Sequence, residues 1–212
     1  MSRRAHESSV GRIPVALGLL AALAALAVTA APVAAQSAWR TPGAWLGAGI
    51  GAGAGAFTCD ACLTSRETGP TLGLAAGVTL TPRFAVAARL DGWVRPHDGV
   101  RDHIGAIGAA AYLFPFARQG LFVSGGLGLS RARVLTHHEG TTDRTSATGL
   151  ALLAGLGYDL GVTRQVSLTP ALEFHTALPS ALRLNGRASG VNVRPSWLEA
   201  RLGLAWHLDR RW

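Results

Sequence analysis

The most constraining feature of the sequence is an alternation of side chains with a period of two. In the segment 71–80, alternate positions are apolar, and the positions between them carry only Gly, Ala and Thr. The apolar positions are Leu72, Leu74, Ala76, Val78 and Leu80. A soluble half-buried strand also alternates, but its second face carries residues such as Lys or Glu, and this sequence contains no Lys. An apolar face opposite a face of small residues is typical of a strand between lipid and a cramped lumen.

The same alternation recurs in seven further segments, so the sequence predicts an all-β chain. The eight predicted strands are Ala44–Phe57, Thr71–Leu80, Phe84–Val94, His103–Phe114, Leu121–Val134, Thr148–Leu160, Gln165–His175 and Trp197–Leu208. Short connections with Pro or Gly alternate with long connections at 58–70, 95–102, 135–147 and 176–196. We therefore predict an eight-stranded antiparallel up-and-down transmembrane β-barrel, with both termini on the side of the short turns, which is the periplasmic side in bacterial barrels.

The N-terminal segment is expected to be a helical signal peptide. Arginines at positions 3, 4 and 12 precede an Ala/Leu run over 13–30, and Val33, Ala34 and Ala35 offer small residues for cleavage. We expect residues 1–35 to be the signal peptide and residues 36–212 to be one outer-membrane β-barrel domain. An uncleaved anchor is the alternative, because the run is close to the length of a spanning helix.

The basic charge of the chain indicates an anionic partner. The formal net charge is +8, and all 20 Lys or Arg residues are Arg. Nucleic acid is not the expected partner, because the arginines are scattered over loops and strand ends and form no stripe. We expect outer-membrane lipid or lipopolysaccharide instead. Arg131 and Arg133 have outward parity beyond Leu127 and Leu129, so they are the predicted contacts to lipid headgroups.

Aromatic residues fall near the ends of the predicted strands, none of them in the middle. Amphipathic rings prefer the headgroup level, so this placement predicts two aromatic girdles. The predicted girdle at the short turns contains Trp45, Phe84, Tyr112, Phe114, Phe116, Phe122, Tyr158, Trp206 and Trp212, and the predicted girdle at the long connections contains Phe57, Trp93, Phe174 and Trp197.

Few charged residues have inward parity, and they gather toward the long connections. They are Arg89, Asp91, Glu173, His175, Glu199 and Arg201. Side chains fill the interior of an eight-stranded barrel, and an isolated buried charge there is costly. We predict that these six groups form one paired network that plugs the lumen. An ion path or a small binding site at the same residues is the alternative.

The cysteines Cys59 and Cys62 lie at the start of the first long connection. An exported chain meets an oxidising compartment, so we predict a local disulfide between them. The alternative is a metal site that adds His137 and His138, although the spacing fits no zinc pattern. We expect no metal and no cofactor. We also expect no catalytic residues, because Ser167 and Thr169, which share a face with Glu173 and His175, lie two or three inward positions below that pair.

The chain resembles the small outer-membrane β-barrel proteins of the OmpA, OmpX and OmpW type, and most of all a general outer membrane beta-barrel domain family of short, exported, porin-like proteins. The resemblance rests on the signal segment, the eight strands, the alternating connections and the terminal Trp212. The end of the chain, with Leu204, Trp206 and Leu208 before Trp212, resembles the signal for the outer-membrane assembly machinery, although Arg210 interrupts it. The resemblance implies a location in the bacterial outer membrane, but it specifies architecture better than function.

From these features we expect a monomeric outer-membrane barrel that is not an enzyme and has a structural or surface-interaction role. A narrow porin-like channel or small-solute carrier is the first alternative. A lipid-modifying outer-membrane enzyme is the second.

Overall fold

The computed structural model describes residues 42–59, 66–97, 100–117, 119–138, 141–163 and 165–208. The strands in this part of the chain are β1 (Gly43–Thr58), β2 (Glu67–Thr81), β3 (Phe84–His97), β4 (Val100–Leu113), β5 (Leu121–His138), β6 (Thr141–Tyr158), β7 (Leu160–Gly161), β8 (Val166–Ala177), β9 (Ser180–Leu184) and β10 (Arg187–His207). Within these ranges, no helix is long and apolar enough to cross a membrane. The predicted signal peptide, Cys62 and Trp212 lie outside the described residues.

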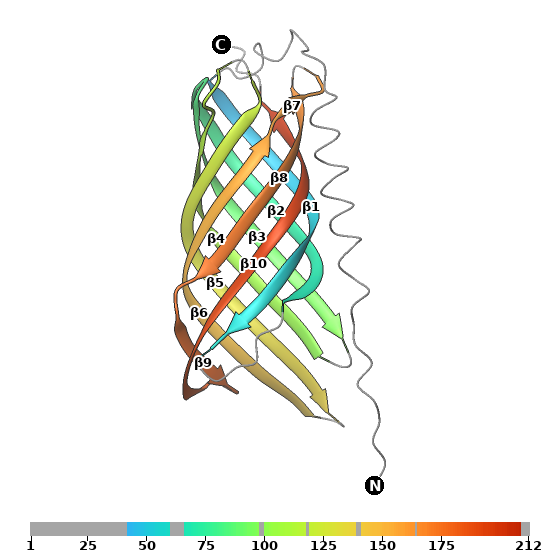
Figure 1. Ribbon diagram of the computed structural model, residues 1–212, viewed down its shortest axis with the longest axis vertical. Coiled ribbons are helices and arrows are strands. Elements are labelled where there is room, and N and C mark those ends of the chain that lie inside the picture. Colours follow the sequence, from blue (N-terminus) through green and yellow to red (C-terminus); the bar gives the residue numbers. More distant parts are fainter. Residues whose placement is uncertain are drawn as a thin grey trace. The chain divides into compact units, whose positions relative to one another are not determined.

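The sheet closes into a barrel because β1 pairs with β2 on one side and with β10 on the other. All pairings are antiparallel, and the eight long strands follow one another around the wall (Figure 1). The two short strands are additions to this wall. β7 pairs with β8 near its start, and β9 lies between β6 and β10. The predicted eight-stranded antiparallel up-and-down barrel is confirmed.

The two ends of the barrel differ in their connections. At the short-turn end β2 joins β3, β4 joins β5, and β6 leads to β8. At the hairpin end β1 joins β2, β3 joins β4, β5 joins β6, and β8 leads through β9 to β10. In bacterial outer-membrane barrels the short turns face the periplasm, so the hairpin end faces outward.

Exposure follows the predicted parity. Leu129 and Leu152 are 55 % and 48 % exposed, whereas the neighbouring inward positions Ser130 and Ala151 are 3 % and 7 % exposed. Twelve of the exposed outer positions are together called the apolar belt: Ile50, Leu72, Leu74, Leu90, Ile107, Leu127, Leu129, Leu150, Leu152, Leu172, Leu202 and Leu204. A continuous apolar surface of this kind is the lipid-facing wall of a transmembrane barrel.

Three of the predicted long loops are largely strand. Only residues 98–99 separate β3 from β4, and only residues 139–140 separate β5 from β6. The prediction ended these strands too early because their outer parts carry polar residues such as Thr136, Thr142 and Thr145. A hairpin beyond the lipid meets water on both faces, so the apolar alternation disappears while β-branched Thr still favours a strand.

The predicted aromatic girdles are only partly correct. Four of the aromatic residues are exposed: Phe84, Phe116, Phe174 and Trp206. Five others point inward and are buried: Trp93, Tyr112, Phe114, Phe122 and Trp197. They lie near the strand ends as predicted, but glycines on nearby strands, such as Gly55 beside Trp93 and Gly157 beside Phe122, leave interior space that the rings fill.

The lipid-facing wall gives a testable prediction. Leu152→Arg should lower the free energy of unfolding by about 2–4 kcal/mol, because a guanidinium would be placed at mid-membrane depth. The matched control is Leu184→Arg on β9, where Leu184 is 52 % exposed and lies outside the belt. It should cost only about 0–1 kcal/mol. Urea titrations in lipid vesicles measure both, and equal effects would contradict the belt.

Candidate functional site

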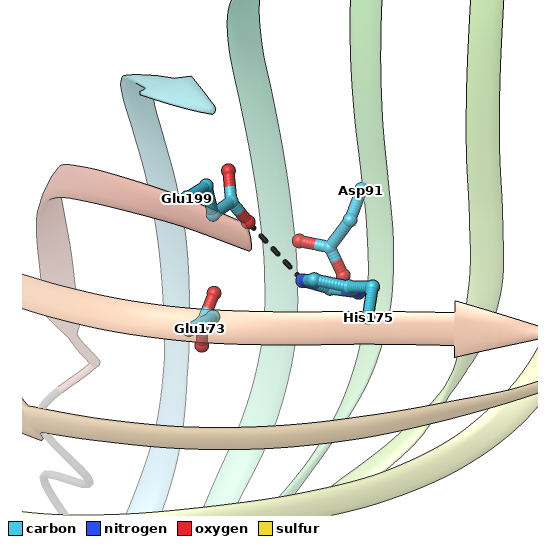
Figure 2. Close-up of side chains that lie close together, drawn as sticks. All are labelled: Asp91, Glu173, His175 and Glu199. Atoms are coloured by element: carbon cyan, nitrogen blue, oxygen red, sulfur yellow. Dashed lines mark hydrogen bonds and ion pairs between the residues drawn. The ribbon is translucent and has the colours of Figure 1, made fainter. Parts of the chain in front are cut away.

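Three strands carry the six charged side chains at the centre of the lumen. Arg89 and Asp91 lie on β3, Glu173 and His175 on β8, and Glu199 and Arg201 on β10. Their alternate spacing turns all six inward. The structure brings all six together, and we call them the lumen network. Figure 2 shows the four that are not arginines, which point toward one another from these strands.

The centre of the lumen network is a fork between Arg89 and Glu173. Arg89 Nη1 donates to Glu173 Oε1 at 2.6 Å, and Arg89 Nη2 donates to Glu173 Oε2 at 2.8 Å. Arg89 Nη2 also donates to Asp91 Oδ1 at 2.7 Å. All three residues are at most 5 % exposed. A bidentate guanidinium–carboxylate pair is among the strongest and most directional polar contacts in proteins.

Arg201 ties β10 into the same centre. Its Nη1 donates to Asp91 Oδ1 at 2.8 Å, and its Nη2 forms an ion pair with Glu173 Oε2. The side chain passes over Gly73 of β2, where a Cβ would overlap Nη1 and lie 2.9 Å from Asp91 Oδ1. Two arginines and two carboxylates therefore link three strands across the lumen, and a glycine on a fourth strand makes room for them.

A second layer lies on the hairpin side of this centre. His175 Nε2 and Glu199 Oε1 are 3.1 Å apart (Figure 2), and the His175 ring stacks on the Trp197 indole at 4.0 Å with an interplanar angle of 6°. Trp93 is buried beside Trp197 and donates from Nε1 to the Gly53 carbonyl at 3.1 Å. This layer fills the lumen above the ion pairs with two indoles and an imidazole.

A cavity of about 90 Å³ lies on the short-turn side of the ion pairs. Arg89, Glu173 and Arg201 line one part of it, and Trp45, Tyr112, Phe114 and Phe122 line another. Tyr112 and Phe122 pack edge to face at 5.5 Å. Toward the short turns, Thr169 donates to Asp159 Oδ1 at 3.1 Å, and Ser167 Oγ lies 3.4 Å from His207 Nε2.

The carboxylates and the imidazole of the lumen network lie close enough together to be considered as ligands of a metal ion. Asp91, Glu173, His175 and Glu199 each offer a ligand atom within 4.8 Å of the others. Carboxylates and imidazole are common ligands of divalent ions. However, Glu173 already carries a guanidinium on each oxygen, and Asp91 Oδ1 carries two. The arginines thus supply the positive charge that a metal would bring, so the arrangement is best described as an ion-pair network.

The other predicted site residues are elsewhere. Arg131 is exposed and Arg133 half-buried, both on the outer face of β5. Cys59 is disulfide-bonded, and its predicted partner Cys62 lies outside the described residues. His137 and His138 lie at the end of β5, and their side chains are not among the described ones.

The sequence interpretation missed the aromatic part of the site. Trp93 has the same parity as Arg89 and Asp91, and Trp197 has the same parity as Glu199, so the alternation that placed the charges also placed these rings inside. The preference of aromatic residues for the headgroup level was given too much weight. Glycines such as Gly55, where a Cβ would lie 2.8 Å from the Trp93 ring, were the signal that large rings pack inside.

Comparison with known proteins identifies the family of the chain and solved structures with a similar fold. A family model described as "Outer membrane protein beta-barrel domain" matches residues 21–170. The solved structure of Neisserial surface protein A is 19 % identical with a TM-score of 0.52, covering 78 % of this chain and 99 % of that one. For Ail, the attachment invasion locus protein of Yersinia pestis, the identity is 14 % and the TM-score 0.52, covering 76 % of this chain and 99 % of that one. No curated protein matches the chain.

The close approach of Arg201 to β2 predicts a sensitive glycine. Gly73→Ala should lower the free energy of unfolding by about 1–3 kcal/mol, because the new methyl group displaces the Arg201 guanidinium from Asp91. Gly203→Ala is the control: it also faces the lumen, but the nearest atom to its Cβ is at 3.4 Å. Urea unfolding compares the two variants, and a Gly73→Ala protein as stable as Gly203→Ala would contradict this placement of Arg201.

The predicted disulfide is tested by mass. Protein extracted directly from the outer membrane should gain the mass of two hydrogens on reduction, while a Cys62→Ser variant should not. Because the loop between the two cysteines is so short, removing the bridge should change global stability little. Two free thiols in the wild-type protein would reject the disulfide.

Proposed function

Because the chain belongs to the outer membrane protein beta-barrel domain family, whose barrels lie in the bacterial outer membrane, we propose that it is a closed barrel with a structural or surface-interaction role. The lumen network carries this proposal. Its carboxylates and Arg89 are at most 5 % exposed, and its groups pair across the interior from three strands. A conducting pore needs a continuous polar path that water can enter, and this centre leaves its charged groups almost no contact with solvent.

The aromatic layer supports closure independently of the charges. Trp93 and Trp197 are each 1 % exposed and pack together with Ile104 and Ala132. An ion passing from the hairpin end would have to displace indoles before it reached the lumen network. The cavity on the other side of the lumen network ends at Arg89, Glu173 and Arg201, so it is a recess of the lumen in this proposal and not a segment of a channel.

A hydrolytic role finds little support in the lumen. Nucleophilic catalysis needs a hydroxyl that is activated by a base and can be reached by a substrate. Ser167 lies 3.4 Å from His207 Nε2, but Ser167 is fully buried and is not among the residues that line the cavity. In this proposal, the Ser167–His207 pair is a structural hydrogen bond at the short-turn end, and the protein is not an enzyme.

Conductance in planar bilayers tests the closed lumen. The purified wild-type barrel should show no steady current. Arg89→Ala leaves Glu173 and Asp91 with less compensation and should lower the free energy of unfolding by about 3–5 kcal/mol, since one partner of a buried pair is removed. The matched control is Arg95→Ala, which breaks the partly exposed Arg95–Glu67 pair at the hairpin end and should cost about 0–1 kcal/mol.

Two results would overturn the proposal in favour of the channel. The first is appreciable steady conductance of the wild-type protein. The second is an Arg89→Ala variant as stable as Arg95→Ala, because a hydrated lumen would screen the uncompensated carboxylates. A current that appears only in Arg89→Ala would support the plug, since the ion pairs would then be what closes the barrel.

A further inference from the structure

Four arginines gather on the outer face of the barrel, just beyond the apolar belt. Arg131 and Arg133 lie on β5, Arg144 on β6 and Arg183 on β9. Arg133 pairs with Ser146, and Ser146 pairs in turn with Arg183, so these three residues form one row across three strands. With strands about 4.8 Å apart, the Cα atoms of Arg133 and Arg183 are about 10 Å apart.

Strand β4 extends the same face. Arg101 pairs with Leu135, and His103 pairs with Arg133, so both have outward parity. We call these six residues the outer basic face: Arg101, His103, Arg131, Arg133, Arg144 and Arg183.

Among the described residues of this end, the acidic side chains of Asp102, Glu67 and Asp143 have inward parity or other partners. Asp102 is 8 % exposed and has inward parity, while Glu67 pairs with Arg95. Asp143 has the parity opposite to Arg144 and accepts a hydrogen bond from Asn185. In the part of the chain that the structure describes, none of the five arginines of the outer basic face forms an ion pair. The guanidinium donors of this face are therefore available for an external anion.

An open cleft concentrates these donors. Arg131, Arg144 and Arg183 line it together with the hydroxyl residues Ser146 and Thr148 and the amide of Asn185. Guanidinium, hydroxyl and amide groups are the donors that recognise phosphate oxygens, and planar guanidinium groups can do so in bidentate geometry.

The position of the cleft identifies the source of the phosphate. Leu129 lies two residues along β5 from Arg131 and is 55 % exposed, and Leu150 lies two residues along β6 from Thr148 and is 57 % exposed. A molecule bound here meets donors at one level and the apolar belt at the next, which fits a phosphate head with acyl chains. A soluble polyanion would leave the apolar part of this surface without a partner.

We propose that the outer basic face binds the phosphate groups of a glycolipid of the outer leaflet, of the lipopolysaccharide type. This inference rests on the proposed surface-interaction role and on the hairpin end facing outward. It extends the predicted contacts at Arg131 and Arg133 to four strands. All three added arginines, Arg101, Arg144 and Arg183, come from segments that the sequence did not predict as strands.

Binding of purified lipopolysaccharide to the folded barrel in neutral detergent micelles tests the proposal. Wild-type protein should bind phosphorylated lipopolysaccharide and lose most of this affinity for the enzymatically dephosphorylated form. Arg133→Ala/Arg183→Ala should weaken binding by roughly fivefold for each arginine, about 25-fold in all. The control Arg66→Ala/Arg83→Ala removes the same charge from two exposed positions outside this face, and its affinity should equal that of the wild type.

Each further outcome decides the proposal. Arg133→Lys/Arg183→Lys keeps the positive charge and should retain more affinity for lipopolysaccharide than the Ala variant. This variant separates the loss of charge from any effect of the substitutions on the surface or the fold. Equal binding by wild type and the Ala variant, or no preference for phosphorylated lipid, would overturn it. If inorganic polyphosphate bound as tightly as lipopolysaccharide, the site would recognise phosphate without its lipid, and the proposal of a glycolipid ligand would be wrong. Conductance of the Ala variant reports separately on the closed lumen, so each proposal can fail alone.

Discussion

The fork between Arg89 and Glu173 is the interaction on which the rest of the interior depends. A carboxylate at 1 % exposure would be unfavourable alone, and so would a guanidinium at 5 % exposure. Each is compensated only while the other holds its position, and Asp91 and Arg201 complete the arrangement. The lumen network contains three carboxylates, two guanidinium groups and one imidazole. The relative positions of β3, β8 and β10 are therefore tied to one set of polar contacts.

This arrangement is possible because the large inward side chains meet small residues on other strands. Gly73 gives space to the Arg201 guanidinium, and Gly55 gives space to the Trp93 indole. An alanine at either position would overlap or press on the group opposite. The Gly and Ala faces that first suggested a narrow lumen are thus the complement of its few large side chains. The interior of an eight-stranded barrel is filled when a few large inward side chains pack against small inward residues on other strands.

Periodicity predicted the architecture and the direction of each side chain, but not its partners. A period of two is a local property, so it placed Arg89, Glu173 and Arg201 in the lumen without any knowledge of the closed sheet. Which carboxylate faces which guanidinium depends on strand stagger, which no short-range pattern contains. The hairpins at 95–102 and 135–147 were missed because solvent on both faces removes the alternation. Trp93 and Trp197 were assigned to the membrane surface because a general preference was allowed to override their parity.

Arginine has opposite roles on the two faces of this wall, and the difference follows from compensation. In the lumen, Arg89 and Arg201 are paired with carboxylates at hydrogen-bond distance, so their charge is cancelled locally and serves packing. On the outer basic face, the described arginines have no such partners, and nearby acids have inward parity or pair with other residues. Within the described residues, the arginines without acidic partners on this face therefore lie on the surface of the barrel. In the proposed lipid contact, these uncompensated charges beside the apolar belt would select the headgroups of the surrounding lipid.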